Sequence, residues 1–312
     1  MTPPLIFIVI PAWNRKSDTL ACLETLRALT YPCYRIVLVD NGSTDGTTLA
    51  VREYWPVVEL ITNTTNQGFA RAVNQGLSHA FEHGADMAFL LNNDTLAAPD
   101  ILEQLLMAYS EEVGILAPKI FYMAEPQRIW SFGGRRHPFT LEKMGDPRGQ
   151  LDGVTWSRMM ECDYLVGCAM LIPRHTWERT GGFDERYFIY YEDMDFSQRV
   201  QATGLRLLAV PNAHLWHKVS VSSGGSDSPN ERYWMARSSV LFFRKYARRW
   251  QWLIVGPYRL GSAVKTTLRL LVRRRFESMR FSLRDGRGRQ AVCLHLSQIL
   301  PIVLSGFVAQ IG

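Results

Sequence analysis

Hydrophobic residues along the first 120 positions follow two patterns that alternate. Short apolar runs predict buried strands at Ile6–Ile10, Arg35–Asp40, Val58–Thr62, Met87–Leu91 and Gly114–Pro118. Between these runs, apolar residues at helical spacing predict two helices, one with Leu20, Leu23 and Leu26 and one with Phe69, Val73, Gly76, Leu77 and Ala80. Strands that alternate with helices predict an α/β fold with a mostly parallel sheet.

Polar residues directly follow three of the predicted strands. These segments are Pro11–Asn14, Asp40–Ser43 and Asn92–Asp94. In an open α/β sheet, ligands bind beyond the carboxyl ends of the strands. We therefore expect the three segments to line one crevice.

The periodic pattern is interrupted from about Arg128 to Thr155, where Gly, Pro and charged residues predict hairpins or a mobile loop. Beyond this stretch we expect a strand at Leu165–Ile172, a short helix after Pro173, a helix that ends near Thr203, and a strand at Leu205–Val210. The 312 residues suit one α/β catalytic domain with an appendage. We predict a catalytic domain at 1–243 and a basic helical extension at 244–312.

Charge is distributed unevenly along the chain. The formal net charge is +6, yet 14 Lys and Arg residues against two acidic residues lie between Arg244 and Arg289, so the remainder is acidic. In this tail, Arg residues from Arg273 to Arg289 alternate with apolar residues, as in helices that bind an anionic membrane surface. A solvated helix docked on the domain explains the pattern equally well. We find no nucleic-acid-binding motif.

Membrane insertion and export have little support in the sequence. The apolar segment Leu294–Ile311 contains His295, Gln298 and Pro301, which favours an interfacial or packing helix over a spanning one. The apolar run Leu5–Ile10 follows no basic segment, which favours a buried strand over a signal peptide. The five cysteines are scattered and predict neither a disulfide framework nor a zinc site, so we expect a reducing cytosol.

Three carboxylates cluster in Tyr190–Asp195, at a predicted helix start just after the Gly-rich turn Gly181–Glu185. Taken alone, helix capping accounts for this cluster better than catalysis does. The polar strand ends described above and His217 change this balance, because one active site can collect all of them. Carboxylates beside aromatic residues then indicate acid–base chemistry.

Two further segments have chemistry suited to a nucleotide. Asp40 can accept a hydrogen bond from a base or a ribose hydroxyl, although an Asx-turn into a helix also explains Asp40–Ser43. Asn66–Gly76 begins a helix with Gly68 at its start and Arg71 one turn later, which suits a phosphate, although a capped helix with a solvated Arg71 is the simpler interpretation. No Gly-x-Gly-x-x-Gly follows the first strand, so a Rossmann dehydrogenase is disfavoured.

Asp94 follows two amide residues at a strand end, in Asn92–Asp94. Hard divalent cations prefer oxygen ligands and keep several waters. One carboxylate, diphosphate oxygens and one further ligand therefore suffice to hold Mg²⁺ or Mn²⁺.

Four segments, read together in this order and spacing, resemble family 2 glycosyltransferases with the GT-A nucleotide-diphospho-sugar transferase fold. They are Asp163–Met170, Gly181–Glu185, Glu192–Asp195 and Pro211–His217. The similarity is greatest to the rhamnosyltransferase-like branch that builds bacterial surface polysaccharides, and it runs from Ile6 to about Tyr246. It implies a GT-A domain with a helical C-terminal extension.

The resemblance also implies roles for individual residues. Asp94 would be the metal-binding end of the family's Asp-x-Asp motif, whose first position is Asn92 here, as is common in this branch. His217 would be a second ligand to the metal or the diphosphate, while His214 belongs to strand packing. Nucleotide-binding residues would be Pro11, Asn14, Asp40, Gly68, Arg71 and Asn93.

By the same resemblance, Asp193 would be the catalytic base, and Glu192 would orient the acceptor or the base. Attack of an acceptor hydroxyl opposite the leaving nucleoside diphosphate inverts the anomeric configuration. Asp195 is equally well explained as a helix-start residue. Trp130, Tyr190 and Trp216 could stack on sugar rings, but large aromatic residues more often belong to the core.

These expectations lead to one main hypothesis and two alternatives. The main one is a metal-dependent inverting glycosyltransferase that moves a sugar such as rhamnose from a nucleoside-diphosphate donor to a lipid-linked or growing glycan, at the inner face of the cytoplasmic membrane. One alternative is a polyprenyl-phosphate glycosyl synthase, although two convincing spanning helices are lacking. The other is a catalytically silent sugar-nucleotide or glycan-binding protein, suggested by Asn92. The donor base, sugar, acceptor and linkage stay open, because one scaffold serves many sugars.

Overall fold

The computed structural model describes residues 2–219 and 228–272 of the chain. They divide into two compact units. The first extends to Arg136 and resumes from Lys143 to Val219, and the second contains His137–Glu142 together with the described residues after Val219.

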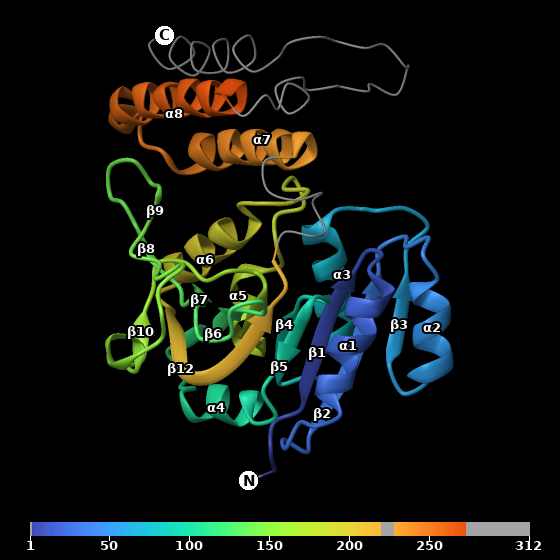
Figure 1. The fold of residues 1–312 in the computed structure, drawn as a ribbon. Coiled ribbons are helices and arrows are strands. Elements are labelled where there is room, and N and C mark those ends of the chain that lie inside the picture. Colours follow the sequence, from blue (N-terminus) through green and yellow to red (C-terminus); the bar gives the residue numbers. More distant parts are fainter. Residues whose placement is uncertain (1, 220–227, 273–312) are drawn as a thin grey trace. The chain divides into compact units, whose positions relative to one another are not determined.

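The first unit is built on one mixed sheet, whose strands Figure 1 shows in colours from blue (β1) to orange (β12). Strands β1 (Ile6–Ala12), β2 (Tyr34–Asp40), β3 (Glu59–Thr62) and β4 (Met87–Leu91) are mutually parallel neighbours. β11 (Ala169–Pro173) runs antiparallel between β4 and β6 (Val113–Tyr122), and β12 (Arg206–His217) is parallel to β6. The five strands predicted in the first 120 residues are all present, and the mostly parallel α/β sheet is confirmed.

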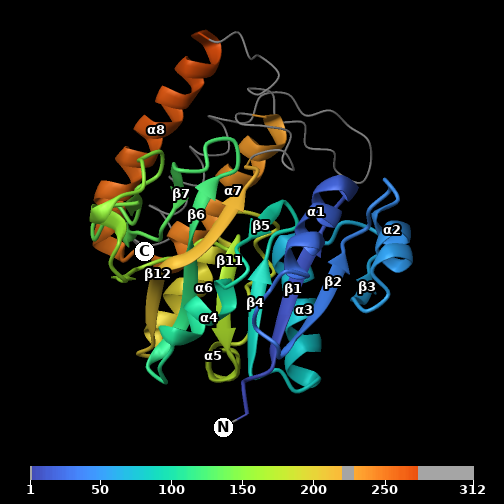
Figure 2. The same cartoon turned by 60° about the horizontal axis from the view of Figure 1, so that its bottom comes forward.

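Helices cover both faces of this sheet, which is why its strands are apolar throughout. All seven residues of β1 are buried, with Ile6, Ile8 and Ile10 in one core cluster and Phe7 and Val9 in the other. Helices α1 (Lys16–Leu26), α2 (Thr47–Tyr54) and α4 (Ile101–Met107) pack into the first cluster, and Figure 2 shows α1 in front of β1 and β2. The second contains residues of α3 (Phe69–Glu82) and α6 (Glu192–Ala202), and Trp177 of α5 (Arg174–Thr180) packs against it.

The last strand extends seven residues beyond its predicted end. We expected Leu205–Val210, but β12 continues through a register shift between Val210 and His214 as far as His217. At the shift, Val210 faces Pro118 and is followed by Pro211, and proline has no N–H to donate to a ladder. The break in pattern that ended the predicted strand is therefore an irregularity within a longer one.

Short elements complete the first unit. β5 (Thr95–Ala97) and β10 (Met160–Glu161) pair with β12, and β7 (Ile129–Ser131) pairs with β6. A predicted hairpin lies between Arg128 and Thr155, where β8 (Arg135–Arg136) pairs with β9 (Lys143–Met144). The predicted strand at Leu165–Ile172 begins only at Ala169, because the buried residues before it form a loop instead of a ladder.

The second unit is helical. It contains α7 (Pro229–Tyr246), a 3-10 turn at Arg249–Gln251 and α8 (Trp252–Val272), with Ser228 capping α7 by accepting from the Glu231 N–H. Residues 137–142 join it through Gln251, which donates to the Pro138 carbonyl at 2.8 Å, and Arg259, which is 2.9 Å from Glu142. This agrees with a helical C-terminal extension, while the domain boundary after residue 243 stays a prediction.

The Arg-rich stretch from Arg273 to Arg289 and the segment Leu294–Ile311 lie outside the described residues. Within residues 2–219 and 228–272, no helix is both long enough and apolar enough to span a bilayer.

Candidate active site

The turn after β2 is held by Asp40. Its side chain is 1% exposed, and Oδ1 accepts a hydrogen bond from the Ser43 N–H at 2.9 Å while Oδ2 accepts from the Thr48 hydroxyl. Both bonds stay within the segment that leads from β2 into α2, so Asp40 has the local role in a turn that the sequence allowed. They fix the turn after β2, and a contact between Asp40 and a nucleotide base stays a prediction.

Asn41 joins the end of β2 to the start of α3, a role that the sequence analysis missed. The residue is buried, and its Nδ2 donates to Gly68 O at 3.1 Å while Oδ1 accepts from the Gln67 N–H at 2.9 Å. The Asn-Gly pair after an apolar strand was the available signal, but it indicated only a turn.

Two predicted nucleotide-binding residues, Asn14 and Asn93, belong to one network. Asn14 has a left-handed backbone (φ 58°), donates from its N–H to the Ser43 hydroxyl at 2.7 Å and accepts from the Thr44 N–H at 2.8 Å. Asn93 is buried, and its Nδ2 lies 3.4 Å from Asn14 O. Pro11 lies close by in β1, paired with Val39 of β2. The ends of β1, β2 and β4 thus meet, as the sequence predicted.

The start of α3 carries the other two predicted nucleotide-binding residues. Gly68 has φ +89°, and a Cβ there would lie 2.7 Å from the Phe188 ring, so this position requires glycine. Arg71 is exposed, and its Nε lies 3.9 Å from the Glu185 carboxylate. The structure thus gives Arg71 a protein partner, and its contact with a donor stays a prediction.

Asp94 and His217, distant in sequence, meet through strand pairing. β5 and β12 pair antiparallel with Thr95 opposite His217, which brings the preceding Asp94 to the imidazole. Asp94 Oδ1 lies 3.1 Å from His217 Nε2, and each side chain is about nine-tenths buried. The edge of Trp130 packs on His217 with 4.4 Å between ring centroids. The pair predicted to hold a metal is therefore assembled.

Trp216 packs against a core cluster as Trp130 does, whereas Tyr190 lies just before α6. Trp216 is the neighbour of His217 in β12, and it stacks on Phe121 at a centroid distance of 6.0 Å and packs against the core. Its contacts favour the core interpretation. Tyr190 is half-buried with φ 68°, directly before Tyr191 at the start of α6. These observations do not test sugar stacking, which stays a prediction for Trp216 and for Tyr190.

Helix α6 begins with the carboxylate pair Glu192 and Asp193. The partly exposed Asp193 accepts from the Met194 N–H at 2.7 Å through Oδ1, and its Oδ2 lies 3.4 Å from the Gly167 N–H. Glu192 is buried. Burial above all, and next the negative charge of Asp193, raise the pKa of Glu192 from 4.5 to about 8. Two adjacent carboxyl groups thus have very different surroundings.

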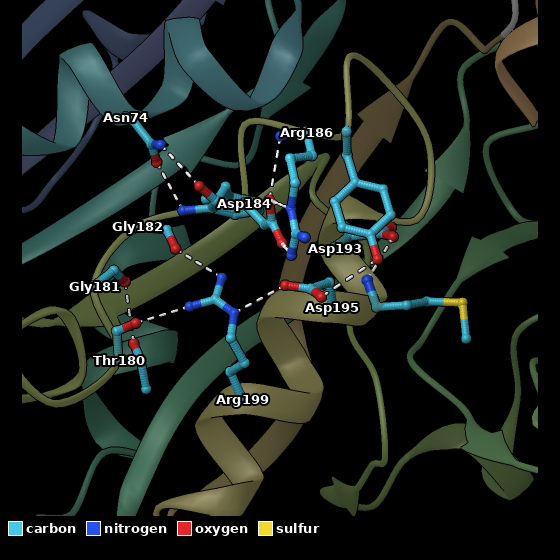
Figure 3. Close-up of polar contacts among 12 residues, drawn as sticks. Asn74, Thr180, Gly181, Gly182, Asp184, Arg186, Asp193, Asp195 and Arg199 are labelled. Atoms are coloured by element: carbon cyan, nitrogen blue, oxygen red, sulfur yellow. Dashed lines mark hydrogen bonds and ion pairs between the residues drawn. The ribbon is translucent and has the colours of Figure 1, made fainter. Parts of the chain in front are cut away.

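Asp195 belongs to the support of this helix (Figure 3). Its fully buried carboxylate lies 2.8 Å from Arg199 Nε, and Arg199 also donates to the carbonyls of Thr180 at 2.8 Å and Gly182 at 2.7 Å. Asn74 of α3 bonds the backbone of Phe183. The Gly-rich turn is therefore held to α6 and α3, a role of Arg199 that the sequence analysis missed.

The Asp94–His217 pair and the Glu192–Asp193 pair are linked through one backbone segment. The Asn92 N–H donates to Cys168 O at 2.9 Å, and the preceding Gly167 contacts Asp193. Six buried polar atoms around these two pairs have no hydrogen-bond partner: Asn92 Oδ1, Trp130 Nε1, Asp146 Oδ1, Tyr164 Oη, Glu192 Oε2 and His217 Nδ1. Buried polar groups are normally satisfied, so these six atoms are available to bind a ligand or water.

Comparison with known proteins gives the family. The family model described as "Glycosyl transferase family 2" matches residues 7–166 of this chain. A second family model, "Glycosyl transferase family group 2", matches residues 89–308. An N-acetylglucosaminyl-diphospho-decaprenol L-rhamnosyltransferase of Mycobacterium tuberculosis is 28% identical over 287 residues, covering 82% of this chain and 91% of the relative. The dTDP-rhamnosyl transferase RfbF of Shigella flexneri is 24% identical, covering 77% and 80%.

Solved structures give the fold. The mannosyltransferase PcManGT from Pyrobaculum calidifontis, in complex with GDP-Man and Mn²⁺, matches 99% of this chain and 88% of its own with 15% identity and a TM-score of 0.52. GalNAc-T7 with UDP, GalNAc and Mn²⁺ matches 69% of this chain and 44% of its own with 16% identity and a TM-score of 0.56. The chain therefore belongs to glycosyltransferase family 2, has the GT-A fold, and is a glycosyltransferase similar to the rhamnosyltransferases of that family.

Proposed function

We propose that this enzyme is a metal-dependent inverting glycosyltransferase of bacterial cell-surface polysaccharide synthesis. It moves a sugar of the rhamnose type from a nucleoside-diphosphate donor to a lipid-linked or growing glycan. One observation carries the proposal: the Asp94–His217 pair and the Asp193 carboxylate flank the Asn92–Cys168 backbone link within one site. The names of the rhamnosyltransferase relatives support the sugar and the lipid-linked acceptor.

Asp94 and His217 fit a divalent metal that is completed by substrate. They supply a carboxylate oxygen and an imidazole nitrogen, and Asn92 Oδ1 adds an amide oxygen that has no hydrogen-bond partner. In the part of the chain that the structure describes, no group of three or more His, Cys, Asp or Glu side chains could hold a metal ion. Diphosphate oxygens and water would therefore complete the coordination of Mg²⁺ or Mn²⁺. When bound, the metal would neutralise charge on the leaving diphosphate.

The donor nucleotide is proposed to lie along the ends of β1, β2 and β4. Asn14, Asp40, Gly68 and Asn93 are held there by the network that Asn41 completes. Because these groups are fixed by protein hydrogen bonds, little ordering is needed when a nucleotide binds.

Asp193 is proposed to be the catalytic base. It lies in the first turn of α6 and is partly exposed, so an acceptor hydroxyl can reach this carboxylate. As the acceptor oxygen bonds to the anomeric carbon, its proton passes to Asp193, and the bond from that carbon to the diphosphate oxygen breaks. Glu192, protonated at neutral pH, can donate a hydrogen bond to the acceptor or to Asp193.

Attachment to the inner face of the cytoplasmic membrane is proposed for the second unit. Leu253, Ile254, Tyr258 and Val264 are 40–66% exposed and share one side of α8, whereas Val255 on the opposite side is buried. Glu231 is the only acidic residue between positions 228 and 272, where basic residues are abundant. An apolar helix face on a basic unit suits an anionic membrane surface.

A thermal-shift and calorimetric screen tests the donor site. Sugar nucleotides of deoxythymidine, uridine and guanosine diphosphate are each added with Mn²⁺ or with chelator. We expect one series to stabilise the protein only with metal, and Asp94→Ala to lose this effect, whereas Asp100→Ala at the exposed start of α4 keeps it. Equal stabilisation in chelator would contradict metal dependence. No binding of any donor by folded protein would contradict the proposed donor site.

A further inference from the structure

Two cations lie beside the proposed active site on the segment Lys143–Arg148, named here the cationic loop. Lys143 belongs to β9, and Arg148 follows the turn at Gly145–Pro147. Neither residue has a role in the function proposed above. Burial raises the pKa of the Asp146 carboxyl, and the positive charges of Arg148 and Lys143 partly oppose this effect.

Arg148 lies on the side of the metal-binding pair. Its guanidinium carbon is 5.0 Å from the centroid of the Trp130 ring, and Trp130 in turn contacts His217. Arg148 Nε is 3.7 Å from Asp146, and the side chain is half exposed. Trp130 and Asp146 hold Arg148 beside the site, and the terminal N–H groups of a guanidinium can bind oxygen atoms of an anion.

Lys143 lies on the side of the carboxylate pair. Its Nζ is 4.8 Å from the centroid of Tyr164, a buried residue whose hydroxyl has no hydrogen-bond partner. Its charge also acts on Glu192, the neighbour of Asp193. Within residues 2–219 and 228–272, no carboxylate lies within 4.0 Å of Lys143. The Lys143 ammonium is thus held near the site without a direct counter-ion there.

The cationic loop is fixed at both of its ends. Before it, β9 pairs with β8, with Met144 opposite Arg135. After it, the Gly149 N–H donates to Ile129 O and the Ile129 N–H donates to Gln150 O, both at 2.8 Å, so the chain lies along β7, which carries Trp130. Cations presented on a fixed backbone lose less entropy on binding than cations on a free loop.

We propose that Lys143 and Arg148 bind a diphosphate group of a substrate, and that this is the diphosphate joining the acceptor glycan to its lipid carrier. The inference rests on the proposed function. Two cations that flank a site bind a polyanion by charge-assisted hydrogen bonds, and a guanidinium bonds phosphate through two N–H groups. The donor's diphosphate is already assigned to Asp94 and His217. The charge of Lys143 acts on Glu192, next to the proposed base that meets the acceptor hydroxyl, and Arg148 beside Trp130 is the second cation of the pair.

The test compares wild type with Lys143→Gln, Arg148→Gln and the double variant. Arg179→Gln, an exposed arginine at the end of α5, is the matched control. Calorimetry measures binding of farnesyl diphosphate, with farnesol as the uncharged control, and separately binding of the nucleotide-sugar donor. Transfer assays compare a prenyl-diphosphate-linked sugar acceptor with an alkyl glycoside of the same sugar.

We expect the double variant to bind farnesyl diphosphate at least about tenfold more weakly and to raise KM for the diphosphate acceptor by a similar factor. The double variant should keep the wild-type affinity for the donor and the wild-type kcat on the alkyl glycoside. Arg179→Gln should match wild type in every measurement. Weaker donor binding alone would assign the diphosphate to the donor and overturn the acceptor assignment. Unchanged binding of both diphosphates, or equal slowing on both acceptors, would overturn the site itself.

Failure of the proposed function has a different outcome. Wild-type protein that transfers no sugar to either acceptor, yet binds farnesyl diphosphate through Lys143 and Arg148, would retain the diphosphate site without the proposed reaction.

Discussion

Replacing Glu192 with Gln should change how stability depends on pH. Glu192 is buried, and its pKa is raised from 4.5 to about 8 chiefly by that burial. Between these values the folded protein holds a proton that the unfolded chain has released. The free energy of unfolding therefore falls as pH rises through this window. The contribution of the Glu192 proton to stability is complete only below about pH 4.5. Gln keeps the size of the protonated acid and cannot ionise, so this loss should disappear.

The magnitude follows from the two pKa values. At about 1.36 kcal/mol per pH unit, the difference amounts to roughly 4–5 kcal/mol once Glu192 is fully charged in the folded state. Most of it, roughly 4 kcal/mol, develops from about pH 5 to about pH 9. This is an upper bound, because water that enters the site around a charged Glu192 lowers the loss.

The assay is urea unfolding at a series of pH values from about 5 to 9. The free energy of unfolding of wild type should fall relative to that of Glu192→Gln, and the two curves should be closest at the acidic end. Glu178→Gln, an exposed glutamate on α5, should instead follow wild type throughout. Parallel curves for wild type and Glu192→Gln would refute the buried, protonated state of Glu192.

Three further changes test the support of the site and the second unit. Arg199→Met removes the cation paired with a fully buried carboxylate, so it should lower the free energy of unfolding in urea titrations by about 3–5 kcal/mol. A loss below about 1 kcal/mol would contradict this role of Arg199. Gly68→Ala should destabilise the protein by roughly 1–3 kcal/mol more than Gly84→Ala. Both glycines have positive φ, but only a Cβ at position 68 would meet a neighbouring ring. Equal urea-unfolding midpoints of the two variants would contradict this prediction. Leu253→Glu should weaken flotation with anionic vesicles, and unchanged flotation would remove α8 from the proposed membrane surface.

The sequence predicted the elements whose pattern is local. β1 and β4 were found because both faces of the sheet are covered, which makes their runs uniformly apolar. β5 was not found, because three residues carry no periodicity. The second half of β12 was missed because Pro211 interrupts the ladder where the strand in fact continues.

The candidate site was predicted as a set of residues but not as a geometry. That Asp94 meets His217 depends on β5 pairing with β12, a contact between segments 120 residues apart that no local pattern reveals. The high pKa of Glu192 depends on burial, and its neighbour Asp193, equally acidic in sequence, is partly exposed. The role of Arg199 depends on its bonds to the Gly-rich turn, which join segments that no local pattern connects.

The most direct test of the proposed function is the transfer rate of Asp193→Asn, measured beside its affinity for the donor sugar nucleotide. Asn keeps the size of the side chain but cannot take the acceptor proton. The proposal predicts that transfer falls by a factor on the order of 10² or more while donor affinity stays within about twofold of wild type. Transfer at the wild-type rate would contradict the role of Asp193 as catalytic base.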